Sequence, residues 1–174
     1  MAQSKGVSRR QFLQNSGATA AGFAAAGGIV FGPDHAWALS TKTLDAHTAE
    51  TLLGVARAMF PHDRLGDQYY AAVVEKLDTA ATGDPALRSL IADGVARLDA
   101  ARGMPWLKLS EGGRTAALKS LEATEFFAAV RTQTVDGLYG NPLVYRYFGY
   151  EGSSVEYGGY LERGFDDIGW LPKI

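Results

Sequence analysis

The 174-residue chain contains no cysteine, and this absence excludes several classes of function. Without thiols the chain cannot form a disulfide, hold an iron–sulfur cluster on cysteine ligands or attach haem through a Cys-x-x-Cys-His motif. A cysteine nucleophile is excluded as well. In an oxidising compartment the chain would therefore have no disulfide to stabilise it.

The sequence also lacks the short motifs of nucleotide-binding proteins and of serine hydrolases. Neither Gly-x-x-x-x-Gly-Lys-Ser/Thr nor Gly-x-Gly-x-x-Gly occurs, and no serine lies in a Gly-x-Ser-x-Gly elbow. Charged residues of both signs are interspersed, without the clustered basic face that nucleic-acid binding requires. We therefore expect no nucleic-acid partner and no cofactor bound to this chain.

The first 38 residues have the pattern of a twin-arginine export signal. A polar stretch with paired arginines is followed by the weakly apolar run "NSGATAAGFAAAGGIVFG". This run, rich in alanine and glycine, is less apolar than the ~20 strongly apolar residues of a membrane span. The alternative interpretation is that the two arginines occur by chance ahead of a helix that lies at a membrane surface. The residues assigned to the export signal are Ser8, Arg9, Arg10, Phe12 and Leu13.

The expected signal-peptidase site is marked by the small residues Ala36 and Ala38 in "AWA". Cleavage after Ala38 leaves residues 39–174, which is 136 residues and suits a single domain. The signal holds three of the 17 Lys and Arg residues and one of the 19 Asp and Glu residues. The remaining 14 basic and 18 acidic residues give a formal charge of −4. We expect a periplasmic protein.

Hydrophobic periodicity predicts a mainly α, small irregular domain of about five helices between residues 44 and 138. Thr48 is the expected N-cap of the first helix and Pro61 its end. Asp84 and Pro85 open the third helix as N-cap and first residue, and Ser110 caps the fourth. No stretch of the mature chain alternates with period two, so we expect no sheet. The apolar stripe of the first helix is Leu52, Val55, Ala56, Met59 and Phe60.

The segment 137–174 is unusually rich in glycine and aromatic residues. It holds eight of the 15 glycines and nine of the 15 aromatic residues that follow residue 38. Frequent glycine disfavours regular helix, whereas frequent aromatics disfavour disorder. We expect an ordered, non-regular segment, and two interpretations stay open. It wraps a partner protein, since Tyr, Trp and Arg concentrate binding energy at interfaces, or it packs only on its own helices.

Histidine and carboxylates gather only in "FPHDRLGDQYY", residues 60–70. His62 with Asp63 or Asp67 suggests an alternative function, a stand-alone periplasmic enzyme or a ligand-binding domain centred on His62 and Asp63. A metal site needs three or four ligands at one point, and His47 is the only other histidine after residue 38. The simpler interpretation is that Pro61 ends one helix and Asp63 or Asp67 caps the next.

Three runs of sequence resemble a known family. They are "TLLGVARAMFPHDRLGD", "EFFAAVRTQTVDGLYGNPLVYRYFGYEG" and "GGYLERGFDDIGWLP", behind the twin-arginine signal. Together they resemble the gluconate 2-dehydrogenase subunit 3 family, the small subunits of FAD-dependent alcohol and sugar dehydrogenases. The most specific piece is the pattern FF-x-x-V-R-x-x-T-x-x-G-x-Y at residues 126–139. The tail "GFDDIGWLPKI" does not match the sugar dehydrogenase small subunits, so no substrate is implied.

The resemblance implies a non-catalytic subunit that stabilises an FAD-binding oxidoreductase of the GMC type and carries it to the twin-arginine translocon. The FAD belongs to that large subunit, a c-type cytochrome subunit is a further expected partner, and any membrane association is expected through these partner subunits. The family supplies no catalytic residue or metal ligand for this chain. From composition within the matching runs, together with Arg163 as a cation able to pair across a boundary, the expected interface residues are Phe127, Arg131, Tyr139, Tyr145, Tyr147, Phe148, Tyr150, Tyr160, Arg163, Phe165 and Trp170.

Overall fold

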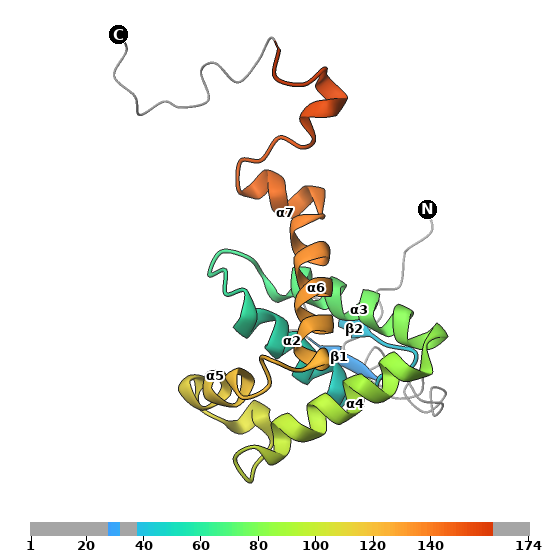
Figure 1. The fold of residues 1–174 in the computed structure, drawn as a ribbon, viewed down its shortest axis with the longest axis vertical. Coiled ribbons are helices and arrows are strands. Elements are labelled where there is room, and N and C mark those ends of the chain that lie inside the picture. Colours follow the sequence, from blue (N-terminus) through green and yellow to red (C-terminus); the bar gives the residue numbers. More distant parts are fainter. Residues whose placement is uncertain (1–27, 32–37, 162–174) are drawn as a thin grey trace, which may run out of the picture.

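A computed structural model describes residues 28–31 and 38–161 of the chain (Figure 1). These residues form a mainly helical domain with one small sheet, which confirms the predicted fold class. No helix in the described ranges is both long enough and apolar enough to cross a membrane. The strands and α-helices are β1 (Ile29–Phe31), β2 (Ala38–Ser40), α2 (Ala46–Met59), α3 (Asp67–Gly83), α4 (Pro85–Ala100), α5 (Glu111–Lys119), α6 (Glu125–Tyr139) and α7 (Pro142–Tyr147).

The helix boundaries follow local capping chemistry, and most agree with the sequence. Asp84 accepts hydrogen bonds from the N–H groups of Ala86 and Leu87 at 2.9 and 3.1 Å, ahead of Pro85 at the first position of α4. Ser110 caps α5 by accepting from the N–H of Gly113 at 3.3 Å. These caps satisfy N–H groups that have no partner within the helix.

Two expected caps differ in the structure. The N-cap of α2 is Asp45 rather than Thr48: the Asp45 carboxylate accepts from both the N–H and the hydroxyl of Thr48, at 2.9 and 2.7 Å. Thr48 therefore donates to the carboxylate three residues upstream and does not itself cap the helix. At α3 the N-cap is Gly66, without a side-chain cap, and Asp67 lies in the first turn. There Asp67 pairs with Arg57 at 2.8 Å.

The small sheet departs from the expectation of no sheet. Strand β1 pairs antiparallel with β2, placing Val30 opposite Leu39. Strands of three residues are too short to show a period-two alternation, which is why the pattern gave no signal. Strand β1 lies within the stretch assigned to the export signal, and β2 spans the expected cleavage site.

Helix α7 lies within the segment expected to be non-regular. Asn141 caps it by accepting from the N–H of Leu143 at 3.0 Å, and Pro142 occupies its first position. The same pattern, an N-cap followed by proline, opens α4. In this segment the high glycine content predicts the absence of regular helix, and that prediction is wrong for α7. After α7, a single 3₁₀ turn (Ser154–Tyr157) is the remaining helical element of the described chain.

The main core lies between α2, α3, α4 and α6, with Leu39 of β2 and Trp106 added to it. Trp106 is fully buried; its indole N–H donates to the carbonyl of Arg114 at 3.1 Å, and its backbone N–H donates to Asp99 at 2.8 Å. Asp99 also contacts His47 at 2.7 Å. Asp99 therefore ties the loop after α4 to the first turn of α2.

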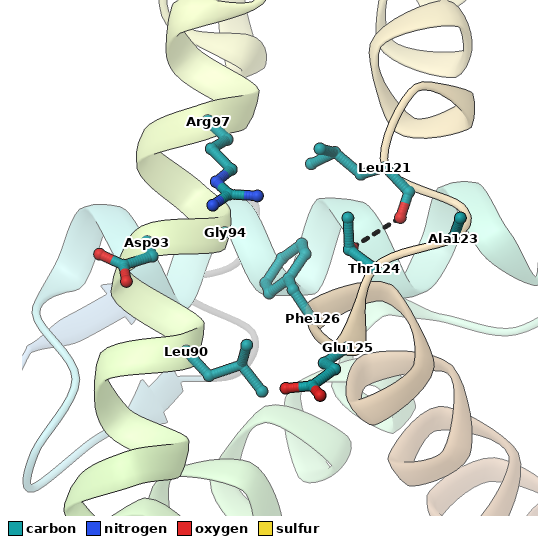
Figure 2. Close-up of a pocket in the computed structure, with 9 residues that line it drawn as sticks. All are labelled: Leu90, Asp93, Gly94, Arg97, Leu121, Ala123, Thr124, Glu125 and Phe126. Atoms are coloured by element: carbon teal, nitrogen blue, oxygen red, sulfur yellow. Dashed lines mark hydrogen bonds between the residues drawn. The ribbon is translucent and has the colours of Figure 1, made fainter.

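Helices α4 and α6 approach each other closely at Gly94. Figure 2 shows the ring of Phe126, at the start of α6, lying against Gly94 beside a shallow hollow between the two helices. A Cβ at position 94 would lie 2.1 Å from the ring, far inside van der Waals contact. Phe126 is only 2 % exposed, so the ring has little room to move.

Replacing Gly94 with alanine is therefore expected to lower the free energy of unfolding by about 2 kcal/mol, as overpacked cores do. The matched control is Gly112→Ala in α5, where an added Cβ would meet nothing within 4 Å. That change should raise stability by up to about 1 kcal/mol through helix propensity. Urea denaturation of both variants measures the difference. Equal effects at the two sites would contradict the close approach.

Candidate partner-binding surface

Large apolar side chains are exposed along one continuous stretch of chain, residues 139–161, which we call the aromatic arm. Of the ten such side chains exposed in the described ranges, nine lie in the arm. Figure 1 shows α7 and the segment after it (orange to red) extending away from the helical body. The exposed apolar residues of the arm are Tyr139, Leu143, Tyr147, Phe148, Tyr150, Val155, Tyr157, Tyr160 and Leu161.

The arm begins at a cluster of rings around His62. The imidazole Nε2 of His62 lies 2.7 Å from the hydroxyl of Tyr139 at the end of α6. The centre of its ring lies 5.0 Å from that of Phe148, at a tilt, and 5.8 Å from that of Tyr139, edge-on; Phe60 also meets Tyr139 edge-on, at 6.0 Å. The loop between α2 and α3 thus supports the base of the arm.

A second small core fixes α7 to the body. Val144 is fully buried and packs in a cluster with Leu65, Tyr70, Val73 and Leu138. Within this short helix Val144 is buried, whereas the residues on the opposite face of the helix are exposed to solvent. The arm is therefore anchored to the body through Val144, while most of its large apolar side chains are exposed to solvent.

The C-terminal end of α7 is a Schellman motif, which explains one of the frequent glycines. Gly149 has a φ of 81°, a left-handed conformation that glycine adopts without strain. The N–H of Tyr150 donates to the carbonyl of Tyr145 at 2.9 Å, and Gly149 donates to Arg146 at 3.0 Å. The rings of Tyr145 and Tyr150 meet edge-on at 5.3 Å. Glycine and aromatics here build a defined turn.

The expected interface residues fall into three groups. Tyr139, Tyr147, Phe148, Tyr150 and Tyr160 are exposed on the arm, and Tyr145 is half-buried beside Tyr150. Arg131 is exposed on α6, whereas Phe127 is half-buried and packs against the main core of the body. Phe127 is thus in part a core residue. Arg163, Phe165 and Trp170 lie outside the described residues.

Sequence reasoning missed four exposed apolar residues of the arm: Leu143, Val155, Tyr157 and Leu161. All four lie in the glycine- and aromatic-rich segment, so its composition indicated the right region of the chain but not these individual residues. Leu143, Val155 and Leu161 are not aromatic, so an enrichment in aromatic residues does not single them out. Tyr157 lies outside the runs that carry the family resemblance. The signal residues Ser8, Arg9, Arg10, Phe12 and Leu13, with Ala36, lie outside the described ranges, and Ala38 is exposed in β2.

The contacts of His62 and Asp63 favour a structural role, support of the arm, over a catalytic or metal-binding role. In the described structure His62 is bonded to Tyr139 rather than to Asp63, and Asp63 is exposed. Arg57 stabilises the loop from its other side, donating to the carbonyl of Leu65 at 3.0 Å and lying 5.2 Å from the centre of the Tyr70 ring. No three His, Asp or Glu side chains of the described ranges are grouped closely enough to hold a metal.

Two tyrosines at the base of the arm have raised pKa values because burial disfavours the charged phenolate. Burial raises the pKa of Tyr70, against a smaller opposing effect of the Arg57 cation, and partial burial raises the pKa of Tyr139, whose side chain is otherwise exposed. The hydroxyl of Tyr70 donates to the carbonyl of Phe60 at 2.6 Å. Both hydroxyls are therefore neutral in the ordinary pH range.

This shift predicts loss of stability in alkali. Unfolded tyrosine titrates near pH 10, so the stabilising effect of neutral Tyr70 is complete below that pH. It is lost as the pH rises through the higher folded value. Urea denaturation at pH 8 and at about pH 11 should show a fall in the free energy of unfolding that is smaller in Tyr70→Phe than in the unmodified chain. An equal fall in both would show that Tyr70 does not carry the effect.

Comparisons of the chain with protein-family models, with curated proteins and with solved structures give no match. Function must therefore be inferred from the residues of the chain itself. Its most distinctive feature is the exposed apolar face of the aromatic arm, which joins the body through the ring cluster at His62 and the buried Val144.

Proposed function

We propose that this chain is a non-catalytic small subunit that binds and stabilises an FAD-dependent GMC oxidoreductase and escorts it through the twin-arginine pathway. The observation that carries the proposal is the aromatic arm, whose large apolar side chains are exposed to water. Soluble monomers rarely expose large contiguous apolar patches, and larger ones mark interaction sites. A partner that covers the arm explains why these residues are apolar.

The composition of the arm fits a protein partner. Tyrosine, phenylalanine and arginine are enriched in the centres of protein interfaces. Here the exposed rings of Tyr147, Phe148 and Tyr150 belong to the same segment as the exposed charges of Arg146 and Glu156. Tyrosine side chains bury a large area with few rotatable bonds, so little entropy is lost when a partner orders them.

The nature of the partner is inferred from the family resemblance and from the export signal. The large subunit binds FAD and performs the oxidation, and a c-type cytochrome subunit accepts the electrons. A chain that binds only the folded large subunit stabilises it by mass action. Such binding favours export of a complete, cofactor-loaded complex. We place the complex in the periplasm, held at the membrane through its partner subunits.

The test is export of a GMC flavoprotein that lacks its own signal, taken from the same genome and co-expressed with this chain. Changing Arg9 and Arg10 together to lysine should hold the flavoprotein in the cytoplasm. The matched control changes Arg97 and Arg102 to lysine, both exposed and outside the signal, and should leave export intact. Equal periplasmic flavoprotein with and without the arginine pair would refute the escort function.

A further inference from the structure

The bond expected to be cut by signal peptidase is built into the folded domain. Strand β1 comes from the export-signal side of that bond and pairs with β2, which contains Ala38 and Leu39. Phe31 lies opposite Ala38 and Val30 opposite Leu39 in the ladder. Leu39, the residue just after the expected cut, is fully buried in the main core.

Gly28, just before β1, is fastened to the domain by Thr41. The N–H of Gly28 donates to the Thr41 hydroxyl at 2.9 Å, and the N–H of Thr41 donates to the Gly28 carbonyl at 2.9 Å. The Thr41 hydroxyl lies 2.5 Å from the carbonyl of Leu44 and donates to it. Both residues are buried, so these hydrogen bonds are shielded from water.

Gly28 also lies against the start of α2 with no space for a side chain. A Cβ at this position would approach the backbone nitrogen of Ala46 to 2.3 Å. The partly buried Val30 packs against the main core next to it. A segment that serves only as an address label needs neither this close fit nor this pairing. Residues 28–31 therefore have the properties of a structural part of the domain.

A protease binds its substrate as an extended strand that it can reach along its backbone, and cleavage concentrates at exposed, poorly bonded sites. To present the bond between Ala38 and Leu39, the folded chain must separate β1 from β2 and withdraw Leu39 from the core. The rate of cleavage is then limited by the population of this opened state.

We propose that the folded chain is not cut after Ala38 and keeps residues 28–38, with the segment before them, after export. This inference rests on the proposed export, because a twin-arginine substrate folds before it meets the peptidase, so β1 and β2 are already paired. It replaces the 136-residue mature chain expected from the sequence with a longer one.

The test is the intact mass and N-terminal sequence of the chain, tagged at its C-terminus and recovered from the periplasm with its flavoprotein. We expect no product that begins at Leu39. A periplasmic chain that begins at Leu39 would overturn the inference while leaving the export proposal standing. A chain that never reaches the periplasm would instead overturn the export proposal.

Two variants examine the cause of the protection. Gly28→Val, whose side chain cannot fit beside Ala46, should release β1 and produce the fragment that begins at Leu39. Lys42→Ala changes an exposed neighbouring side chain and should leave the chain uncut. An uncut Gly28→Val chain recovered folded from the periplasm would show that the fit of β1 does not protect the bond.

If Gly28→Val does not fold, purified components decide the question. Signal peptidase in detergent should cut a synthetic peptide of residues 15–45 about tenfold or more faster than the folded full-length chain, because the peptide needs no opening step. Equal cleavage rates would overturn the proposal. A peptide that is not cut at all would also overturn it, since the sequence rather than the fold would then protect the bond.

Discussion

Replacing Asp78 with alanine is expected to lower the free energy of unfolding by about 3 kcal/mol. Asp78 lies on α3, is only 3 % exposed, and accepts three backbone hydrogen bonds from the segment after β2. The donors are the N–H groups of Lys42 at 2.7 Å, Thr43 at 2.9 Å and Leu44 at 2.8 Å. One carboxylate therefore holds the connection between the small sheet and α2.

The predicted loss of stability is large because the substitution leaves a buried backbone N–H group without an acceptor. Alanine removes all acceptors at once, and the N–H of Leu44 is buried, so water does not readily replace the lost carboxylate. Loss of the clamp should also loosen Thr41, which precedes the clamped residues and fastens Gly28. The same variant is therefore expected to raise the susceptibility of the Ala38–Leu39 bond to proteases.

Urea denaturation of Asp78→Ala beside Asp93→Ala provides the measurement and its control. Asp93 is exposed on α4, and surface substitutions of this kind change stability by about 0.5 kcal/mol or less. If both variants lose the same small amount, the clamp described for Asp78 does not contribute to stability.

Removing single rings from the aromatic arm is expected to weaken partner binding strongly. Tyr147→Ala or Tyr150→Ala should each cost about 2 kcal/mol of binding free energy if the residue is a hot spot, which raises Kd about 30-fold. The effect is large because each ring is half exposed in this chain, 51 % for Tyr147 and 53 % for Tyr150, and would be covered in the complex.

Met104→Ala is the matched control for these changes. Met104 is 47 % exposed and is the one large apolar side chain exposed outside the arm among the described residues. Its loss removes similar exposed apolar area from the helical body and should leave Kd unchanged. Thermal unfolding of each free variant separates lost binding from lost folding. Unchanged Kd in both tyrosine variants would exclude these rings as anchors of the interface.

The helices of the body could be predicted because their sequence signals are local. Apolar stripes recur at helical spacing, and the caps Asp84 and Ser110 lie next to the helices they begin. The errors arose where two local signals compete or where a contact is distant in sequence. Asp45 and Thr48 are both good N-caps, and only the fold shows which one accepts and which donates. Strand β1 depends on pairing with residues seven to eleven positions away.

The position of the candidate surface followed from composition, but its exposed face did not. Frequent aromatics indicated an ordered segment, and both a partner-binding and a self-packing role stayed open. The described structure shows elements of each: Val144 is buried against the body, whereas Tyr147 and Tyr150 face solvent. The contact of His62 with Tyr139 joins residues 77 positions apart. No local pattern predicts such a contact.

The most direct test of the escort function is purification of the tagged full-length chain from the periplasm of cells that also express the GMC flavoprotein. We expect the flavoprotein to co-purify in a fixed ratio, to give the preparation the absorption spectrum of oxidised flavin, and to be lost in the Tyr147→Ala, Tyr150→Ala double variant. A folded chain that is recovered alone, without flavin and unaffected by these substitutions, would contradict the proposed function.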